Sequence, residues 1–127
     1  MDVFDSGTAV LGDEFGILTG RWERQYSTQG LPFDAMWCVV PPGAVGHEDD
    51  HDERELQIVV SGRGAVETPA TGRVLHIRPG MAMLLEPRER HILHNHSADD
   101  PLVILSVYWL PGQAPAPRTV EEDTVVG

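Results

Sequence analysis

The stretch GAVGHEDDHDERELQIVVSG, residues 43–62, decides the fold of this chain. Its first half is polar, and positions 46–55 hold two histidines and six carboxylates against one arginine. Its second half is an apolar run of strand length that ends at a glycine. Side chains two positions apart on an extended chain point to the same face, so His51, Glu55 and Gln57 project together. The stretch therefore predicts an acidic loop that enters a β-strand.

A carboxylate on the inner face of a β-domain is costly to bury unless a positive charge compensates it. A bound cation is the simplest way to compensate the buried negative charge, because the carboxylate then also serves as a ligand of the cation. The same parity places His47 and Asp49 on the side of His51 and Glu55, so both are candidate ligands. On charge alone, the alternative interpretation is a solvated acidic loop.

Short apolar segments separated by Gly, Pro and Asp clusters make up the rest of the chain, which is typical of an all-β domain. Turn-forming residues occur at PPG (41–43), SGRG (61–64) and RPG (78–80). Their spacing predicts a sandwich or a barrel with one core. The expected strands are residues 8–12, 15–20, 33–41, 55–62, 64–69, 73–79, 81–87, 90–95 and 101–110.

Charge and composition exclude several classes of function. Acidic residues outnumber basic ones by 20 to 9, which disfavours nucleic acid and anionic membranes as partners. All nine basic residues are arginines, so lysine Schiff-base chemistry is excluded within this chain. One cysteine, Cys38, rules out an internal disulfide, and no apolar run is long enough to span a membrane. We therefore expect a cytoplasmic protein.

A second group of histidines lies in RHILHNHS, residues 90–97. His91 begins an apolar strand and shares a face with Leu93 and Asn95, whereas His94 points to the opposite face. Only one of these histidines is expected to face a pocket.

With both groups in view, the sequence resembles the cupin family over roughly residues 33–109. The first family motif is a glycine, five residues, His-x-His, three or four residues, a glutamate, six residues and a glycine. The second is similar to RPGMAMLLEPRERHILHN, residues 78–95, although the usual Pro-x-Gly before its histidine is not kept. The first motif falls on Gly43, Asp49 (in place of the first histidine), His51, Glu55 and Gly62, and the second on Gly80, Pro87, His91 and Asn95.

This resemblance implies a double-stranded β-helix, the jelly-roll cupin barrel. It also implies that His51, Glu55 and His91 bind a divalent metal, with either Asp49 or His47 as a fourth ligand. Fe, Zn, Mn and Ni all suit such a set. Gln57, the next inward polar residue, is a candidate contact for substrate.

The resemblance further divides the chain into three parts. Residues 1–32 would form N-terminal strands and a dimerisation segment, residues 33–109 the cupin barrel, and residues 110–127 an acidic, proline-rich tail. Cupins commonly pair through N-terminal strands, so a homodimer is expected, with the segment GILTGRWERQYS (16–27) adding an edge strand to its neighbour.

The function that these features imply is a metal-dependent cupin enzyme acting on a small organic substrate in bacterial specialised metabolism. The reaction would be a cyclisation, a rearrangement or N–N bond formation. For the last, HDERELQIVVSGRG (51–64) and LSVYWL (105–110) resemble the cupin partner of methionyl-tRNA-synthetase-like enzymes that build hydrazines. The alternatives are a non-catalytic small-molecule-binding cupin and an Fe(II)-dependent dioxygenase.

Overall fold

Residues 1–113 are described by the computed structural model of the chain, and the expectations for residues 114–127 lie outside them. Within residues 1–113 there are nine strands, one short α-helix and two 3₁₀ turns. The strands are β1 (Gly12–Glu14), β2 (Ile17–Arg21), β3 (Asp34–Val40), β4 (Arg54–Ser61), β5 (Gly64–Thr68), β6 (Arg73–Ile77), β7 (Ala82–Leu85), β8 (Ile92–His94) and β9 (Leu102–Trp109). The helix is α1 (Trp22–Gln25), and the turns are η1 (Ser6–Thr8) and η2 (Pro111–Gln113).

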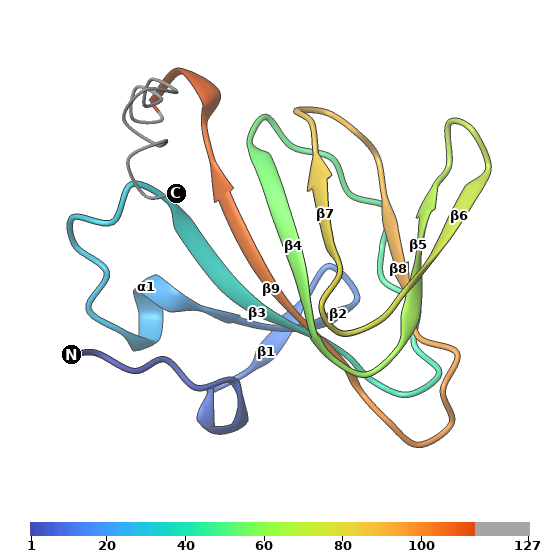
Figure 1. The fold of residues 1–127 in the computed structure, drawn as a ribbon, viewed down its shortest axis with the longest axis horizontal. Coiled ribbons are helices and arrows are strands. Elements are labelled where there is room, and N and C mark those ends of the chain that lie inside the picture. The colour runs from blue at the N-terminus through green and yellow to red at the C-terminus, as the bar shows by residue number, and fades with distance from the viewer. Residues whose placement is uncertain (114–127) are drawn as a thin grey trace, which may run out of the picture.

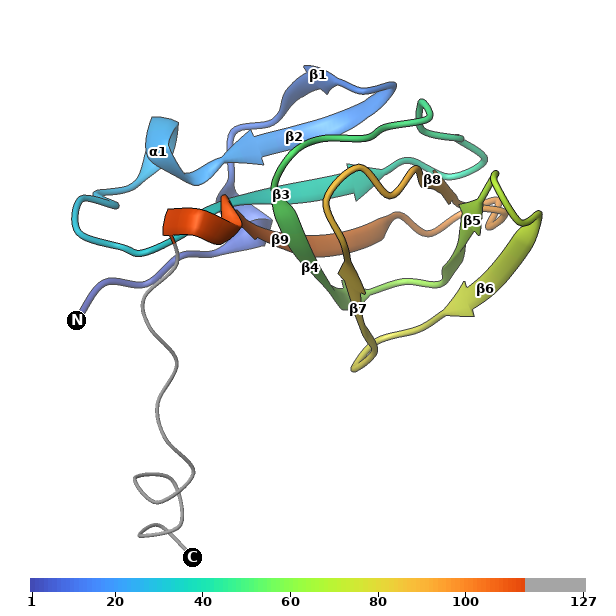
Figure 2. The same cartoon turned by 90° about the horizontal axis from the view of Figure 1, so that it is seen from above.

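These strands form two antiparallel sheets that enclose a barrel (Figure 1). The larger sheet has the order β1-β2-β3-β9-β4-β7, and the smaller one has the order β6-β5-β8. Figure 2 shows the smaller sheet standing across the interior from β9 and β4. The all-β jelly-roll prediction is confirmed.

Alternation along the central strands builds the core. On β9, Leu102 and Ile104 are fully buried, while Val103 between them is only half-buried. Val40 of β3 pairs with Leu102, and Val59 of β4 pairs with Ile104, so aliphatic side chains from three strands meet inside the barrel. Polar residues occupy the remaining end of the interior, where β4 begins and β9 ends.

Two expectations for the N-terminal region are wrong. No strand spans 8–12, because the side chain of Gln25 takes the place of a strand partner: its Oε1 accepts from the Val10 N–H at 2.8 Å and its Nε2 donates to the Val10 carbonyl at 2.9 Å. Segment 16–27 is not a free edge strand either. Its first part, β2, is paired on both sides by β1 and β3, and its second part turns into α1.

Asn95 explains why an asparagine follows β8. Its buried Nδ2 donates to the carbonyls of Val40, at 2.9 Å, and Asp100, at 2.8 Å. Its Oδ1 accepts from the Ser97 N–H at 2.9 Å. One side chain thus ties the end of β3 to the turn that leads into β9.

Gly62, which closes the first sequence motif, sits where two backbones nearly touch. Its φ of +80° is left-handed, and a Cβ added there would lie 2.1 Å from the carbonyl oxygen of Pro101. Gly72 in the β5–β6 turn has a similar φ of +70°, but a Cβ there would meet no atom within 4 Å. Both positions therefore favour glycine for its left-handed backbone, but only Gly62 also needs the absence of a Cβ to avoid a clash.

We expect Gly62→Ala to cost about 3 kcal/mol or more of unfolding free energy, since left-handed strain adds to a backbone clash. Gly72→Ala should cost about 1 kcal/mol, because only the left-handed strain applies. Urea denaturation of both variants measures this, and equal losses would contradict the close approach at Gly62.

Candidate metal centre

The loop that precedes β4 is held against β8 by backbone hydrogen bonds. The Gly46 N–H donates to the Leu93 carbonyl at 2.8 Å. Farther along, Asp49 and His91 exchange two bonds: the Asp49 N–H donates to the His91 carbonyl at 3.1 Å and the His91 N–H to the Asp49 carbonyl at 3.2 Å. This antiparallel bridge brings Asp49 of the first motif to His91 of the second.

The two histidines of the site are oriented in the same way. Nδ1 of His51 lies 3.0 Å from the Glu53 carbonyl, and Nδ1 of His91 lies 3.1 Å from the Glu89 carbonyl. A carbonyl only accepts, so each Nδ1 must carry the proton that it donates. In the neutral rings Nε2 is then left as a free lone pair, which is the form that binds metals.

Glu55 lies between these rings and is only 3% exposed. Its Oε1 is 2.8 Å from His51 Nε2 and 3.7 Å from His91 Nε2. Its Oε2 accepts from Ser106 Oγ on β9 and from Gln57 Nε2, the latter at 3.0 Å. The carboxylate is thus fixed at one oxygen and presents the other to both histidines.

Burial raises the pKa of Glu55, but the hydrogen bonds from His51, Ser106 and Gln57 and the charge of His91 outweigh it and leave the pKa below its usual value. The hydrogen bond that protonated His51 donates to the Glu55 carboxylate raises the pKa of His51 to about 9. Burial raises the pKa of Asp49. Without a metal, a proton on His51 therefore serves as the cation that compensates the buried carboxylate.

A metal ion can take the place of that proton. One ligand atom each from Asp49, His51 and His91 lies within 4.8 Å of the others. Glu55 Oε1, which faces both imidazoles, adds a second carboxylate to this donor set. Two imidazole nitrogens with one or two carboxylates suit Fe, Mn, Zn and Ni, so these residues fit a divalent metal.

His47 also lines the inner cavity, but it is not in the group of Asp49, His51 and His91 whose ligand atoms lie close together. Its exposed ring packs against Gly16, where an added Cβ would lie 2.7 Å from His47 Cδ2. Its backbone N–H donates to the Phe15 carbonyl at 2.8 Å, which holds the residue at the β1–β2 turn. Of the two candidates for a fourth ligand, Asp49 is the one that lies with His51 and His91.

Gln57 faces the interior of the barrel and is 2% exposed. Since its Nε2 is committed to Glu55, its Oε1 points away from the carboxylate, and within the described residues this oxygen has no hydrogen-bond partner. It lines an inner cavity of about 30 Å³ together with Cys38, His91 and Leu93. The cavity has room for about one or two water-sized groups.

Glu48, Asp50 and Asp52 of the loop form ion pairs with two arginines that precede His91. Arg88 lies 3.6 Å from Asp50 and 3.5 Å from Asp52. Arg90 lies 3.6 Å from Glu48 and 3.5 Å from Asp50. The two arginines are largely exposed, so these ion pairs are weak individually.

A pocket of about 210 Å³ opens above His51 and Glu55, while His91 lines the inner cavity below it. Phe15, Met36 and Tyr108 form its apolar walls, and Asp49, Asp50 and Glu53 lie at its acidic side. It shares lining residues with the inner cavity, so the two spaces adjoin. A small organic molecule could reach the histidines from here.

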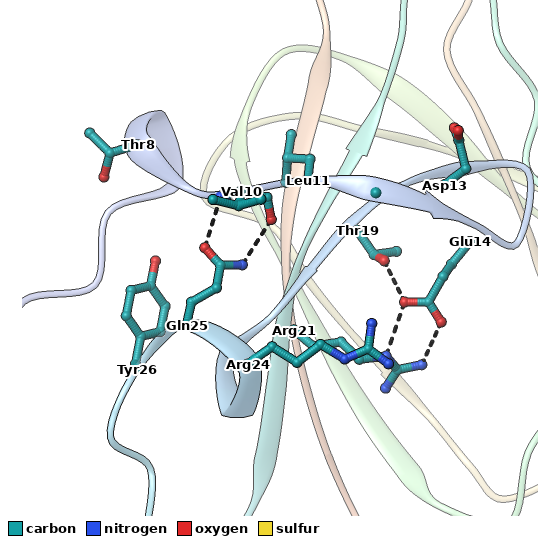
Figure 3. Close-up of a pocket in the computed structure, with 11 residues that line it drawn as sticks. Thr8, Val10, Leu11, Asp13, Glu14, Thr19, Arg21, Arg24, Gln25 and Tyr26 are labelled. Atoms are coloured by element: carbon teal, nitrogen blue, oxygen red, sulfur yellow. Dashed lines mark hydrogen bonds and ion pairs between the residues drawn. The ribbon is translucent and has the colours of Figure 1, made fainter.

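Arg21 reaches the same pocket from β2, where Glu14 and Tyr108 fix its guanidinium. Glu14 binds it in a bidentate pair, at 3.0 Å and 2.9 Å, and the Tyr108 hydroxyl accepts from it at 3.0 Å. Figure 3 shows this pair and Thr19 in a second hollow, of about 580 Å³, which lies beside β1 and α1. That hollow contains no histidine, so the metal centre belongs to the smaller pocket.

Sequence reasoning missed Ser106 and the Arg21–Tyr108 contact. Ser106 follows Leu102 and Ile104 at two-residue spacing on the inner face of β9. A single hydroxyl in this aliphatic series is the sequence feature that points to a polar contact in the interior. Arg21 and Tyr108 are 87 positions apart, so no local pattern connects them.

The sequence profile described as the cupin domain matches residues 36–108, which is more than half of the chain. The chain therefore belongs to the cupin family.

Solved structures agree with this fold. A Cupin 2 conserved barrel domain protein from Salinispora arenicola is similar over 100% of this chain and 98% of its own, with a TM-score of 0.75 and 24% identity. The polyketide cyclase RemF from Streptomyces resistomycificus has a TM-score of 0.70 at 18% identity, over 85% of this chain and 78% of its own. A predicted oxalate decarboxylase from Thermotoga maritima has a TM-score of 0.69 at 18% identity, over 86% and 99%.

Among residues 1–113, no helix has the length and apolar character needed to cross a bilayer.

Ser106 fixes the Glu55 oxygen that does not face the histidines, so we expect Ser106→Ala to lower the affinity for a divalent metal about tenfold. Competition with a chromophoric chelator measures the affinity for Zn²⁺. Ser61→Ala, at the exposed end of β4, is the control and should bind as the unmodified protein does. Equal affinities in all three proteins would contradict this role of Ser106.

The Glu14–Arg21 pair should make stability depend on pH. Hydrogen bonds from Arg21 and Thr19 lower the pKa of Glu14 from 4.5 to about 2. The carboxylate therefore stabilises the fold fully above about pH 4.5, and this contribution is lost as the pH falls through about 2. About a quarter of the Glu14 side chain is exposed, so solvent screening limits the contribution to about 1 kcal/mol.

Accordingly, Glu14→Gln should lose about 1 kcal/mol at pH 7 relative to the unmodified protein, and the difference should shrink between pH 4.5 and 2. Urea denaturation across this range tests it. Asp13→Asn removes an exposed carboxylate of the same strand and is the matched control. A difference between Glu14→Gln and the unmodified protein that stays constant over the range would count against the pair.

Proposed function

We propose that this cupin is a metal-dependent enzyme that acts on a small organic substrate. The observation that carries the proposal is the convergence of His51 Nε2 and His91 Nε2 on the Glu55 carboxylate, next to a pocket of about 210 Å³ that His51 and Glu55 line. His51, His91 and Glu55 would hold the metal, and Asp49 would be the fourth ligand rather than His47. When bound, the metal would polarise a substrate oxygen or bind oxygen beside the substrate.

The protein's own residues would bind and orient the substrate. Phe15, Met36 and Tyr108 would pack against its apolar part. Gln57 Oε1, buried and without a partner in the described residues, would accept a hydrogen bond from the substrate group nearest the metal. The half-buried Glu53 at the mouth has no ion pair within residues 1–113, which favours a cationic or amine-bearing substrate.

We place the reaction among the tailoring steps of bacterial specialised metabolism. The likeness in fold to the polyketide cyclase RemF supports this class. Cyclisation, rearrangement and N–N bond formation with a synthetase-like partner are the reactions to assay. The single cysteine, which is buried, fits work in the cytoplasm.

Metal analysis of protein purified without a metal-affinity tag tests the proposal. We expect close to one equivalent of Fe, Mn, Zn or Ni per chain. His91→Ala and Asp49→Ala should each lower the metal content at least tenfold, because each removes a ligand. His47→Ala is the matched control, since its ring lies outside the group, and should keep its metal.

If the unmodified protein contains no metal and takes up none of the four ions, the enzyme proposal fails and a non-catalytic binding cupin takes its place. If His47→Ala loses its metal and Asp49→Ala retains it, the fourth ligand is assigned wrongly while the metal centre stands.

A further inference from the structure

Tyr108 brings a hydroxyl group to the wall of the pocket of about 210 Å³. It follows Ser106 at two-residue spacing on β9 and pairs with Glu55 on β4, so it belongs to the row of the barrel that holds the buried carboxylate. Arg21, whose guanidinium contacts the hydroxyl, lines the same pocket. The hydroxyl is therefore in a position to contact a molecule in the pocket.

The contact with Arg21 fixes how this hydroxyl can act. Arg21 Nη1 donates to the Tyr108 oxygen at 3.0 Å. A guanidinium has no acceptor, so the phenol proton takes no part in this bond. In the part of the chain that the structure describes, no residue accepts that proton. Burial raises the pKa of Tyr108 to about 12, so the phenol keeps the proton at neutral pH and can donate it to a bound molecule.

Arg21 is itself held in place. Its Nε and Nη2 donate to the two oxygens of Glu14, at 3.0 Å and 2.9 Å, and Thr19 Oγ1 donates to the same carboxylate at 2.7 Å (Figure 3). A bidentate pair fixes the plane of a guanidinium. Nη1 therefore keeps its direction toward Tyr108, and the bond that it donates restricts rotation of the hydroxyl.

The charges around the pocket favour a neutral acceptor over an anion. Glu14 offsets the charge of Arg21. Asp49, Asp50 and Glu53 line the pocket and repel a carboxylate or a phosphate. A neutral oxygen, such as that of a carbonyl group, can accept the phenol proton without this repulsion.

We propose that Tyr108 determines specificity by donating a hydrogen bond to a neutral carbonyl oxygen of the substrate, with Arg21 as the positioning residue that orients its hydroxyl. This inference rests on the proposed function and narrows its substrate class to small molecules that carry a carbonyl group. Gln57 Oε1 in the inner cavity has the opposite polarity, because an amide oxygen can only accept. The substrate thus meets a donor in the pocket and an acceptor in the inner cavity.

A matched pair of probes tests the role of Tyr108. Acetophenone and α-methylstyrene have the same shape, but acetophenone has an oxygen where α-methylstyrene has a CH₂ group. A ¹³C NMR titration of the full chain, both loaded with Zn²⁺ and metal-free, gives the dissociation constant of carbonyl-labelled acetophenone. Competition gives that of α-methylstyrene. The carbonyl resonance of bound acetophenone should move downfield, because its oxygen accepts a hydrogen bond.

Tyr108→Phe keeps the ring and removes the donor. It should change the ratio of the two dissociation constants about tenfold against acetophenone and abolish the downfield shift. Arg21→Met should change the ratio about threefold, since the hydroxyl remains but can turn away. Tyr26→Phe is the matched control, because it removes the hydroxyl of the other tyrosine, which lines the hollow beside β1 and α1. It should leave the ratio unchanged.

The proposal is overturned if acetophenone does not bind, or if Tyr108→Phe keeps both the ratio and the shift, which would make Arg21 the donor. An unchanged ratio in Arg21→Met overturns the positioning role. Tighter binding of benzoate than of acetophenone to the metal-free chain also overturns the proposal, because the pocket would then select an anion.

The metal content of the same samples keeps this test separate from the proposed function. A chain that takes up no metal refutes the enzyme proposal, whereas the probes on the metal-free chain still decide the role of Tyr108. A chain that binds metal but shows no preference for the carbonyl refutes the role of Tyr108 alone.

Discussion

The buried Glu55 carboxylate is the constraint on which the rest of the site depends. A charge at this depth is tolerated only when it is hydrogen-bonded and compensated. Ser106 and Gln57 satisfy one oxygen, and His51 and His91 face the other. The contacts come from β4, β9, the acidic loop and the start of β8, so the carboxylate couples the fold to its candidate metal centre.

Backbone contacts position these groups without the help of a metal ion. The acidic loop has no strand of its own, yet the bridge between Asp49 and His91 fixes its register against β8. Carbonyls at Glu53 and Glu89 then orient the two imidazoles. Irregular backbone on a rigid barrel thus positions three of the four candidate ligands, Asp49, His51 and His91, while Glu55 comes from β4.

The larger sheet has two apolar faces. The inner face forms the core and ends at the pocket, where Ser106 and Gln57 replace aliphatic residues. The outer face is also aliphatic along β9, where Val103, Leu105 and Val107 are half-buried.

The all-β class, the two motifs and the pairing of His51 with Glu55 were predictable from sequence, because strand alternation and short spacing act locally. The short helix α1 and the absence of a strand at 8–12 were not predictable. The Gln25 side chain forms two hydrogen bonds with the backbone of Val10, and these outweigh the local preference for a strand. The sequence by itself determined that Glu55, Gln57 and His91 face inward, because strand alternation is a local property. Only the tertiary structure brought Asp49 within reach of His51 and His91, and Ser106 to Glu55, because those contacts depend on strand register between segments far apart in the chain.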